Sequence, residues 1–245
     1  MSGHSHYATI HRQKELKDAQ KGKIFSKLAQ IIAIAAKTSS DPESNYKLRM
    51  AIEQAHAANM PKSNIERAIS RASEVGNIEE VTYEGFGPAG IAIIIQAATD
   101  NRNRTGQEIK NLFEREGGSL VGPGAVSFNF EQRGLIVVKK EENFDEQMLK
   151  LIDAGAEDLE ESQDAIEVYT LPEKLNDLRN NLETAGFQIN TFELVQKPIN
   201  YQTVVDSATA SKVLSFLDRL QERDDVAKVF ANLDIPDEVI AKINP

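Results

Sequence analysis

The side chains best suited to acid–base and metal chemistry are gathered near the beginning of this chain. The sequence has 245 residues and no cysteine, and its histidines are His4, His6, His11 and His56. The lack of cysteine excludes disulfides and thiolate metal sites, and it is typical of proteins from reducing compartments. The positions of the histidines exclude a histidine-based acid–base site from the rest of the chain.

The common catalytic and nucleotide-binding motifs are also missing. The chain has no Walker phosphate loop, no dinucleotide-binding glycine pattern, no HExxH and no GxSxG. The carboxylates between Asp153 and Asp164 are better explained as a solvated acidic surface than as a catalytic pair. His4, His6 and His11 could bind a metal, but a fourth ligand is not evident, and contact with phosphate or RNA is the better explanation. We therefore predict no enzymatic activity, no catalytic residue, no metal, no cofactor and no small-molecule substrate.

The charges of the chain are strongly segregated. The formal net charge is −10, yet the chain up to Lys37 has 7 Lys and Arg against 2 Asp and Glu. Residues 38–75 have 5 of each kind, and residues 76–245 have 16 basic against 31 acidic residues. A basic beginning on an acidic body indicates nucleic-acid binding through the basic part, and the acidic body would limit indiscriminate binding.

We predict that this basic beginning contacts nucleic acid. Each contact of a lysine or arginine with phosphate adds salt-dependent, sequence-independent affinity, and Tyr7 could stack on an unpaired base. Simple solubilisation of a helix face is the alternative explanation of the lysines. Arg102 and Arg104 flank a predicted helix start, which attracts anions, but ion pairs with acidic neighbours explain them equally well. The candidate nucleic-acid-binding residues are His4, Tyr7, Arg12, Lys14, Lys17, Lys21, Lys23, Lys27, Arg102 and Arg104.

Three short amphipathic helices are predicted in the first part of the chain, because apolar residues recur there at helical spacing. Their approximate ranges are 21–37, 43–58 and 61–73. The pattern that begins at Ser40 and ends at Glu43 is typical of a helix start. On the third helix, Arg67 and Arg71 lie one turn apart and away from the apolar face.

From Glu79 onward, strand patterns alternate with helical ones. Residues 134–195 follow the order β-α-β-β-α-β, which is the split βαβ order of ferredoxin-like domains. Residues 77–132 include a predicted strand over Ala125–Phe130, and a further β-α-β segment after residue 200 has no partner nearby in sequence.

The fold class that we predict is α+β. It consists of an N-terminal three-helix domain followed by two α/β sandwich domains of the ferredoxin-like, split βαβ type, one inserted in the other. Residues 1–76 form the basic helical domain with an N-terminal arm. Residues 77–132 together with 200–245 form the middle α/β domain, and residues 133–199 form the inserted ferredoxin-like α/β domain. No apolar run is long enough for a membrane span or a signal peptide, so we expect a cytoplasmic monomer without membrane contact.

Short motifs along the whole chain resemble the YebC/PmpR family. They are Gly3-His4-Ser5, Ala8, Ile10, Lys14, Lys21-Gly22-Lys23-Ile24-Phe25, Asp41-Pro42, Asn45, Asn59-Met60-Pro61-Lys62, Tyr83-Glu84-Gly85-Phe86-Gly87-Pro88, Thr99-Asp100-Asn101-Arg102-Asn103-Arg104-Thr105 and Gly117-Gly118. The resemblance implies a three-domain cytoplasmic protein. Bacterial members are described as probable transcriptional regulators that bind DNA, and the family is also similar to a mitochondrial translational activator of cytochrome oxidase synthesis. Some members are regarded as ribosome-associated factors that act at proline-rich stretches.

The arm departs from the pattern of this family. The family usually has Lys-Trp where His6-Tyr7 stand, and a denser basic run where His11-Arg12-Gln13-Lys14 stand. Binding through this arm is therefore expected to be weaker, or more dependent on pH, since histidines titrate near neutrality.

Three functions remain open from the sequence. The first is a DNA-binding transcription regulator, although no pair of predicted helices forms a persuasive helix-turn-helix. The second is a translation factor that binds ribosomal RNA or the ribosome, which suits the basic, aromatic arm and the split βαβ domains. The third is a protein-interaction module whose basic part binds an acidic partner. The usual description of the family favours DNA, whereas the physical character of the arm favours RNA.

Overall fold

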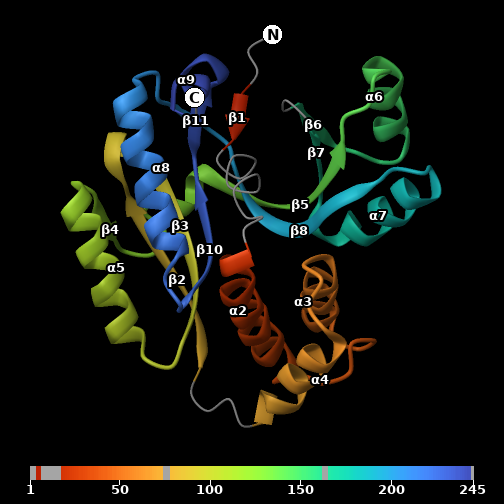
Figure 1. Ribbon diagram of the computed structural model, residues 1–245, viewed down its shortest axis with the longest axis horizontal. Coiled ribbons are helices and arrows are strands. Elements are labelled where there is room, and N and C mark those ends of the chain that lie inside the picture. Colours follow the sequence, from red (N-terminus) through yellow and green to blue (C-terminus); the bar gives the residue numbers. More distant parts are fainter. Residues whose placement is uncertain (1–3, 7–17, 74–77, 162–164, 244–245) are drawn as a thin grey trace.

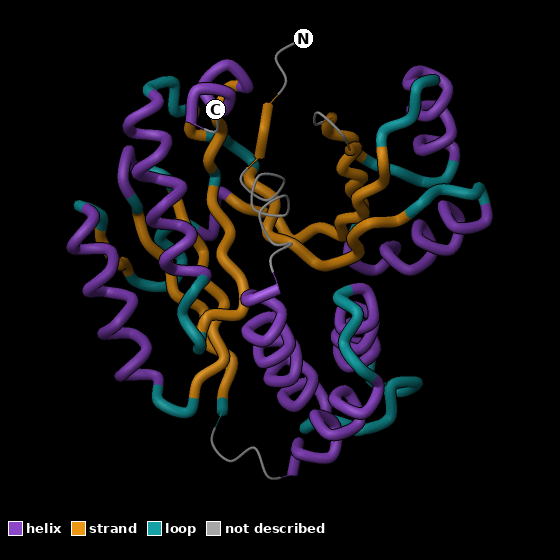
Figure 2. The backbone as a smooth tube through the Cα atoms, in the orientation of Figure 1, coloured by secondary structure: helices purple, strands orange, loops and turns teal. Residues whose placement is uncertain are grey.

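The computed structural model describes residues 4–6, 18–73, 78–161 and 165–243. For residues 4–6 and 18–21, and for Lys23 and Ser73, it describes the main chain alone. The protein is α+β, with three helices near the N-terminus followed by mixed α/β sheets (Figure 1). In the two parts built on larger sheets, helices lie toward the outside and strands nearer the middle of the molecule (Figure 2). No helix of the described residues is both long and apolar enough to cross a lipid bilayer.

The three N-terminal helices pack around one apolar core. They are α2 (Asp18–Ala36), α3 (Tyr46–Ala57) and α4 (Lys62–Ser70), and the 3-10 turn η1 (Arg71–Ser73) follows α4. The core is formed by Ile32, Leu48, Ala51, Ala55, Ile65 and Ala68, among others. The three predicted helices are therefore confirmed, with different boundaries.

The second helix begins later than the Ser40–Glu43 pattern predicts, and Asn45 explains the difference. The Asn45 side-chain oxygen accepts a hydrogen bond from the Leu48 N–H at 3.1 Å, which caps α3. Its amide nitrogen donates to the main-chain oxygens of Ala35 and Ser39, each at 2.7 Å. Asn45 thus forms hydrogen bonds with a free N–H at the start of α3 and with main-chain oxygens at and after the end of α2. The chain between the two helices therefore forms a turn.

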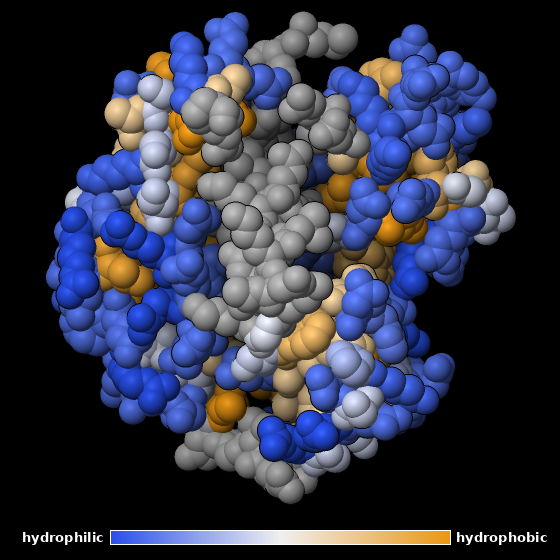
Figure 3. Space-filling view, viewed as in Figure 1, coloured by the Kyte–Doolittle hydropathy of each residue, from blue (hydrophilic) through white to orange (hydrophobic). Residues whose placement is uncertain are grey.

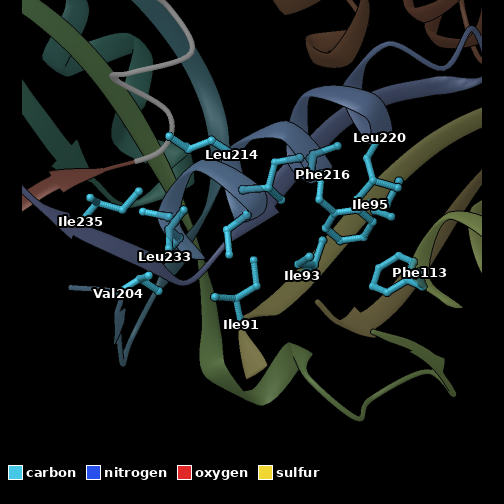
Figure 4. Close-up of a cluster of buried hydrophobic side chains, with 14 of the residues drawn as sticks. Ile91, Ile93, Ile95, Phe113, Val204, Leu214, Phe216, Leu220, Leu233 and Ile235 are labelled. Carbon is cyan, nitrogen blue, oxygen red and sulfur yellow. The ribbon is translucent and has the colours of Figure 1, made fainter. Parts of the chain in front are cut away.

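The middle sheet has the strand order β10-β3-β2-β4, and its neighbours are all antiparallel. Its strands are β2 (Glu79–Phe86), β3 (Ala92–Thr99), β4 (Ser119–Val121) and β10 (Val226–Ala231). Helices α5 (Arg102–Glu116) and α8 (Ser207–Gln221) pack on this sheet. The rings of Phe113 on α5 and Phe216 on α8 contact each other edge to face, with their centroids 5.1 Å apart (Figure 4). Position 85 requires glycine, because the Cβ atom of any other residue would lie 2.4 Å from the Phe113 ring.

The order along this middle sheet, β2-β3-α5-β4 followed by α8-β10, is not the split βαβ order of the predicted fold class. The hairpin of β2 and β3 through the 3-10 turn η2 (Pro88–Gly90) agrees with the turn that the glycines and the proline of residues 85–90 predict. The predicted strand over Ala125–Phe130 is wrong. Its residues lie in a loop and in the 3-10 turn η3 (Ser127–Asn129), and only Phe130 belongs to a strand.

A third, small sheet was not predicted. It has the order β1-β11-β9, with β1 (His4–His6), β9 (Gln202–Thr203) and β11 (Leu233–Pro236), and α9 (Asp237–Ile243) follows it. Within β1, His4 lies opposite Pro236 and His6 opposite Asp234. Part of the arm is thus a strand paired with the end of the chain.

The remaining sheet has the strand order β6-β7-β5-β8, and its neighbours are all antiparallel. Along the chain, the order is β5 (Phe130–Lys139), α6 (Phe144–Asp153), β6 (Asp158–Glu161), β7 (Ala165–Thr170), the 3-10 turn η4 (Pro172–Lys174), α7 (Leu175–Thr184) and β8 (Ile189–Pro198). This is the split βαβ arrangement predicted for residues 134–195. The first and last strands of this part pair with each other from Phe130 opposite Pro198.

Candidate nucleic-acid interface

The start of α2 carries three of the candidate residues and borders a cleft where the three parts of the protein meet. Lys21, Lys23 and Lys27 lie in the first three turns of α2. The cleft has a volume of about 410 Å³, and α2, α3, β8 and β10 contribute most of its walls. Helix α2 packs against β10 and α3 packs against β8, so the basic helix is held against the acidic body.

Lys27 is the one lysine of this group whose side chain the structure describes. It is half-buried, and its Nζ donates a hydrogen bond to the main-chain oxygen of Gln221 at the end of α8. A cation near the last carbonyls of a helix also interacts favourably with the helix dipole. Lys27 therefore connects α2 to α8, which the sequence analysis did not predict.

The other candidates of the arm are described only in part. His4 lies in β1, at the edge of the molecule opposite to α4 (Figure 1), and only its main chain is described. Tyr7, Arg12, Lys14 and Lys17 lie outside the described residues.

The start of α5 is built differently from the anion site suggested by the sequence. The Asn101 side chain caps the helix by accepting a hydrogen bond from the Arg104 N–H at 3.0 Å. Arg104 Nη2 lies 2.8 Å from Asp100 Oδ1 and 3.2 Å from Asp225 Oδ2. Hydrogen bonding to Asp225 raises the pKa of Arg104 above its ordinary value. Two carboxylates of the protein itself thus take the place that phosphate was expected to fill.

Arg102 is the more available of the two arginines. Its main-chain oxygen accepts a hydrogen bond from the Tyr83 hydroxyl at 2.9 Å, while the residue itself is exposed. Within the described part of the chain, its guanidinium makes no ion pair. Ion pairs within the protein therefore explain the position of the Arg104 side chain. For Arg102, contact with a phosphate stays a prediction.

One wall of the cleft is a buried polar network on the sheet of β5–β8. The Lys197 ammonium lies 2.9 Å from Glu160, also bonds Asp158, and stands 4.0 Å from the centre of the Tyr169 ring. Burial lowers the pKa of Lys197, but the hydrogen bond to Asp158 and the charge of Glu160 outweigh it, so this pKa lies above its ordinary value. The ammonium therefore stays charged, as a buried cation with carboxylate partners should.

The same network contains a third carboxylate, Glu167, which is buried. The Tyr169 hydroxyl donates to Glu167 Oε2 at 2.5 Å, and both side chains are almost fully buried. Burial, and then the charge of Glu167, raise the pKa of Tyr169 well above its ordinary value. The network thus has three carboxylates for one ammonium, which disfavours phosphate. Sequence reasoning missed it because its members come from three separate strands.

Among the residues that the structure describes, no three His, Asp or Glu side chains come close enough together to bind a metal ion.

Comparison with known proteins identifies the family. The family model described as the TACO1/YebC protein N-terminal domain matches residues 5–75, and the one described as the TACO1/YebC second and third domain matches residues 78–233. Two proteins named probable transcriptional regulatory protein are similar along the whole chain. The one from Dictyoglomus turgidum is 46% identical over 250 residues, and the one from Aquifex aeolicus is 44% identical over 248 residues. These alignments cover 100% and 99% of this chain, respectively, and 100% of each relative.

A solved structure of a similar protein has the same fold. The crystal structure of the conserved hypothetical protein Aq1575 from Aquifex aeolicus has a TM-score of 0.82 and 45% sequence identity, and the match covers 89% of this chain and 92% of that chain. The relatives are named as regulators and not as enzymes. With both family models matched and near-full-length relatives above 40% identity, the chain belongs to the TACO1/YebC family.

Proposed function

We propose that this protein is a cytoplasmic, non-enzymatic regulator of gene expression that binds DNA through its basic beginning. The observation that carries the proposal is the segregation of charge, with an excess of five positive charges up to Lys37 and a net charge of −15 from residue 76 onward. The names of the relatives as probable transcriptional regulatory proteins support the same proposal.

The surroundings of α2 favour the approach of a polyanion from the basic end of the protein. The carboxylates of the cleft disfavour phosphate, and so does the acidic body as a whole. Lys21 and Lys23 lie at the first turns of α2, where the chain joins the basic arm. Phosphate contacts from this region would fix the nucleic acid at the basic end of the protein.

The test changes Lys21 and Lys23 to glutamate together and leaves Lys27 unchanged, because Lys27 bonds Gln221. We expect at least tenfold weaker binding of a fluorescent DNA duplex, measured by anisotropy, and a shallower dependence of affinity on salt by about 1–2 units of slope. The matched control is Lys110→Glu with Lys212→Glu, two exposed lysines on α5 and α8. Unchanged affinity in the folded Lys21/Lys23 variant, or an equal loss in the control, would refute the proposal.

Binding to ribosomal RNA is the second candidate function. The split βαβ sheet of β5–β8 and an aromatic residue, Tyr7, in a basic arm favour it, because RNA recognition uses such sheets and stacking side chains. Sedimentation of lysate through a sucrose gradient separates the two. Migration with ribosomal particles at low salt, with release at high salt, would favour the ribosome. Recovery at the top of the gradient, together with duplex binding, would favour DNA. Failure to bind either nucleic acid would leave a protein-interaction module.

A further inference from the structure

Helices α3 and α4 are joined by a compact turn of four residues, 58–61. Asn59 in this turn adopts a left-handed conformation with φ = 59°, and its N–H bonds the His56 oxygen at 2.9 Å. The Met60 side chain is buried, and its N–H bonds the Ala55 oxygen at 2.8 Å. Two helices joined by a fixed turn of this length resemble the helix pairs that bind DNA, in which the second helix enters the major groove.

The two faces of α4 differ sharply. Ile65 and Ala68 are buried against α2, in the core of the helical part. The opposite face carries side chains that can donate or accept hydrogen bonds. These are Lys62, Ser63, Glu66, Arg67 and Ser70, and Arg71 follows directly in η1. Such a face can contact both phosphates and base edges.

Among the described residues, the guanidinium groups of Arg67 and Arg71 have no carboxylate partner, a property that they share with the exposed Arg102 and Arg115. Both are exposed, and within the described residues neither guanidinium makes an ion pair. Five other described arginines each pair with a carboxylate, namely Arg104, Arg133, Arg179, Arg219 and Arg223. Two arginines on the surface of a protein with a net charge of −10 are thus available to an external anion.

Helix α4 also lies where a duplex could reach it. It packs against α2 and α3 of its own part, and Figure 1 shows it at the edge of the molecule, away from both larger sheets. The surface at this edge is largely hydrophilic in Figure 3. The outer-face residues of α4 named above are all exposed.

We propose that α4 is a DNA-reading helix whose outer face enters the major groove of a B-form duplex, with Arg67 and Arg71 contacting guanine edges or the flanking phosphates. The inference rests on the proposed DNA binding and adds to it the element that contacts the bases. Arg67 and Arg71 are separated by a rise of about 6 Å along the helix, which fits a groove about 12 Å wide. The major groove of A-form RNA is too narrow for such a helix.

The experiment measures the affinity of Arg67→Ala with Arg71→Ala for two probes. The first is a pool of DNA duplexes selected from random sequence by the unaltered full-length protein, and the second is an RNA duplex of matching sequence. We expect the DNA affinity to fall about tenfold or more, and the RNA affinity to change little. Unchanged DNA affinity, or an equal loss on the RNA duplex, would overturn the proposal.

Two further variants sharpen the test. Arg115→Ala is the matched control, because Arg115 is an exposed arginine on α5 that has no ion pair among the described residues. It should leave DNA affinity unchanged. Glu66→Gln removes the one acidic side chain on the outer face of α4, so it should raise DNA affinity severalfold. A drop of equal size in Arg115→Ala, or no gain in Glu66→Gln, would count against a local contact at α4.

Failure of this inference can be told from failure of the proposed function. If the unaltered protein binds neither probe, the proposed function itself is wrong. If the protein binds DNA and loses binding when Lys21 and Lys23 are reversed, but not when Arg67 and Arg71 are removed, only the role of α4 is wrong.

Discussion

The carboxylate of Glu84 determines the path of the chain between β4 and β5. Glu84 lies on β2 and is only 6% exposed. Its two oxygens accept hydrogen bonds from the main-chain N–H groups of Gly124 and Val126, each at 2.8 Å, and of Ser127 at 3.0 Å. A strand would satisfy such donors through a neighbouring strand, whereas here a side chain does so. This explains why the apolar residues from Ala125 onward form a loop.

We predict that Glu84→Gln lowers the free energy of unfolding by about 1–3 kcal/mol at pH 7, because an amide NH₂ would face a main-chain N–H. Burial raises the pKa of Glu84, but the three N–H donors outweigh it, so this pKa lies below its ordinary value. The stabilisation is therefore present above the ordinary carboxyl pKa and is lost as the pH falls through the lowered one. Urea unfolding at pH 7 and at lower pH measures it.

The control for this prediction is Glu80→Gln, an exposed position on the same strand, which should change stability by less than about 0.5 kcal/mol. A difference between the unaltered protein and Glu84→Gln that stays constant down to acid pH would show that the carboxylate charge is not what holds the loop.

At the scale of single elements, the start of α5 is held by residues far apart in sequence. The Thr105 hydroxyl lies 2.5 Å from Asp225 Oδ2 and 2.8 Å from the Thr99 hydroxyl, at the end of β3. The Asp225 main-chain oxygen accepts a hydrogen bond from the Ala98 N–H at 2.8 Å. One carboxylate thus connects α5, β3 and the loop after α8.

Thr105→Val should lower the free energy of unfolding by about 1–3 kcal/mol, because it removes the donor to the Asp225 carboxylate and the hydrogen-bond partner of the buried Thr99 hydroxyl. The side chain keeps its shape, and Thr105 is 2% exposed, so the change acts through the hydroxyl. Chemical denaturation measures the loss. The same replacement at the exposed Thr82 on β2 should be nearly neutral. Equal effects at both positions would mean that the hydroxyl of Thr105 has no special role.

Local patterns were enough to predict some elements and not others. The β5–β8 part was predicted in the right order along the chain, because its strands and helices lie in one continuous segment and each has its own local sequence pattern. The sheet of β1, β9 and β11 was not, since its strands are two to four residues long and come from opposite ends of the chain. For the candidate site, charge counting identified the basic segment, but it could not show that Arg104 pairs with Asp225 or that Lys27 bonds Gln221.

In the molecule as a whole, polar contacts link parts that are distant in sequence. Arg179 on α7 lies 2.5 Å from Glu53 on α3, and the Tyr46 hydroxyl lies 3.5 Å from the Pro172 oxygen. The apolar core of the helical part and that of the β5–β8 part are largely separate, and Met50 of α3 is the buried side chain of the helical part that belongs to the second core. Units with cores of their own can in principle fold alone.

The last prediction is that residues 130–198 form a domain that folds when produced alone. Their four strands and two helices enclose a core of their own, to which the rest of the chain contributes Met50 and Tyr46. The ends of the fragment are adjacent, because Phe130 lies opposite Pro198 and the Ile199 N–H bonds the Asn129 oxygen at 2.7 Å. We expect a cooperative thermal transition by circular dichroism and dispersed amide signals by NMR.

A fragment of equal length, residues 142–210, is the matched control for this experiment. It keeps α6, β6, β7, α7 and β8 but lacks β5, the strand that lies between β7 and β8. Without that strand, β8 has no hydrogen-bonding neighbour in the sheet, and the apolar side chains of Ile136 and Val138 are missing from the core. The control should therefore be unfolded. If the 130–198 fragment is equally unfolded, this part depends on the helical part and on the middle sheet, and the three-domain description of the protein fails.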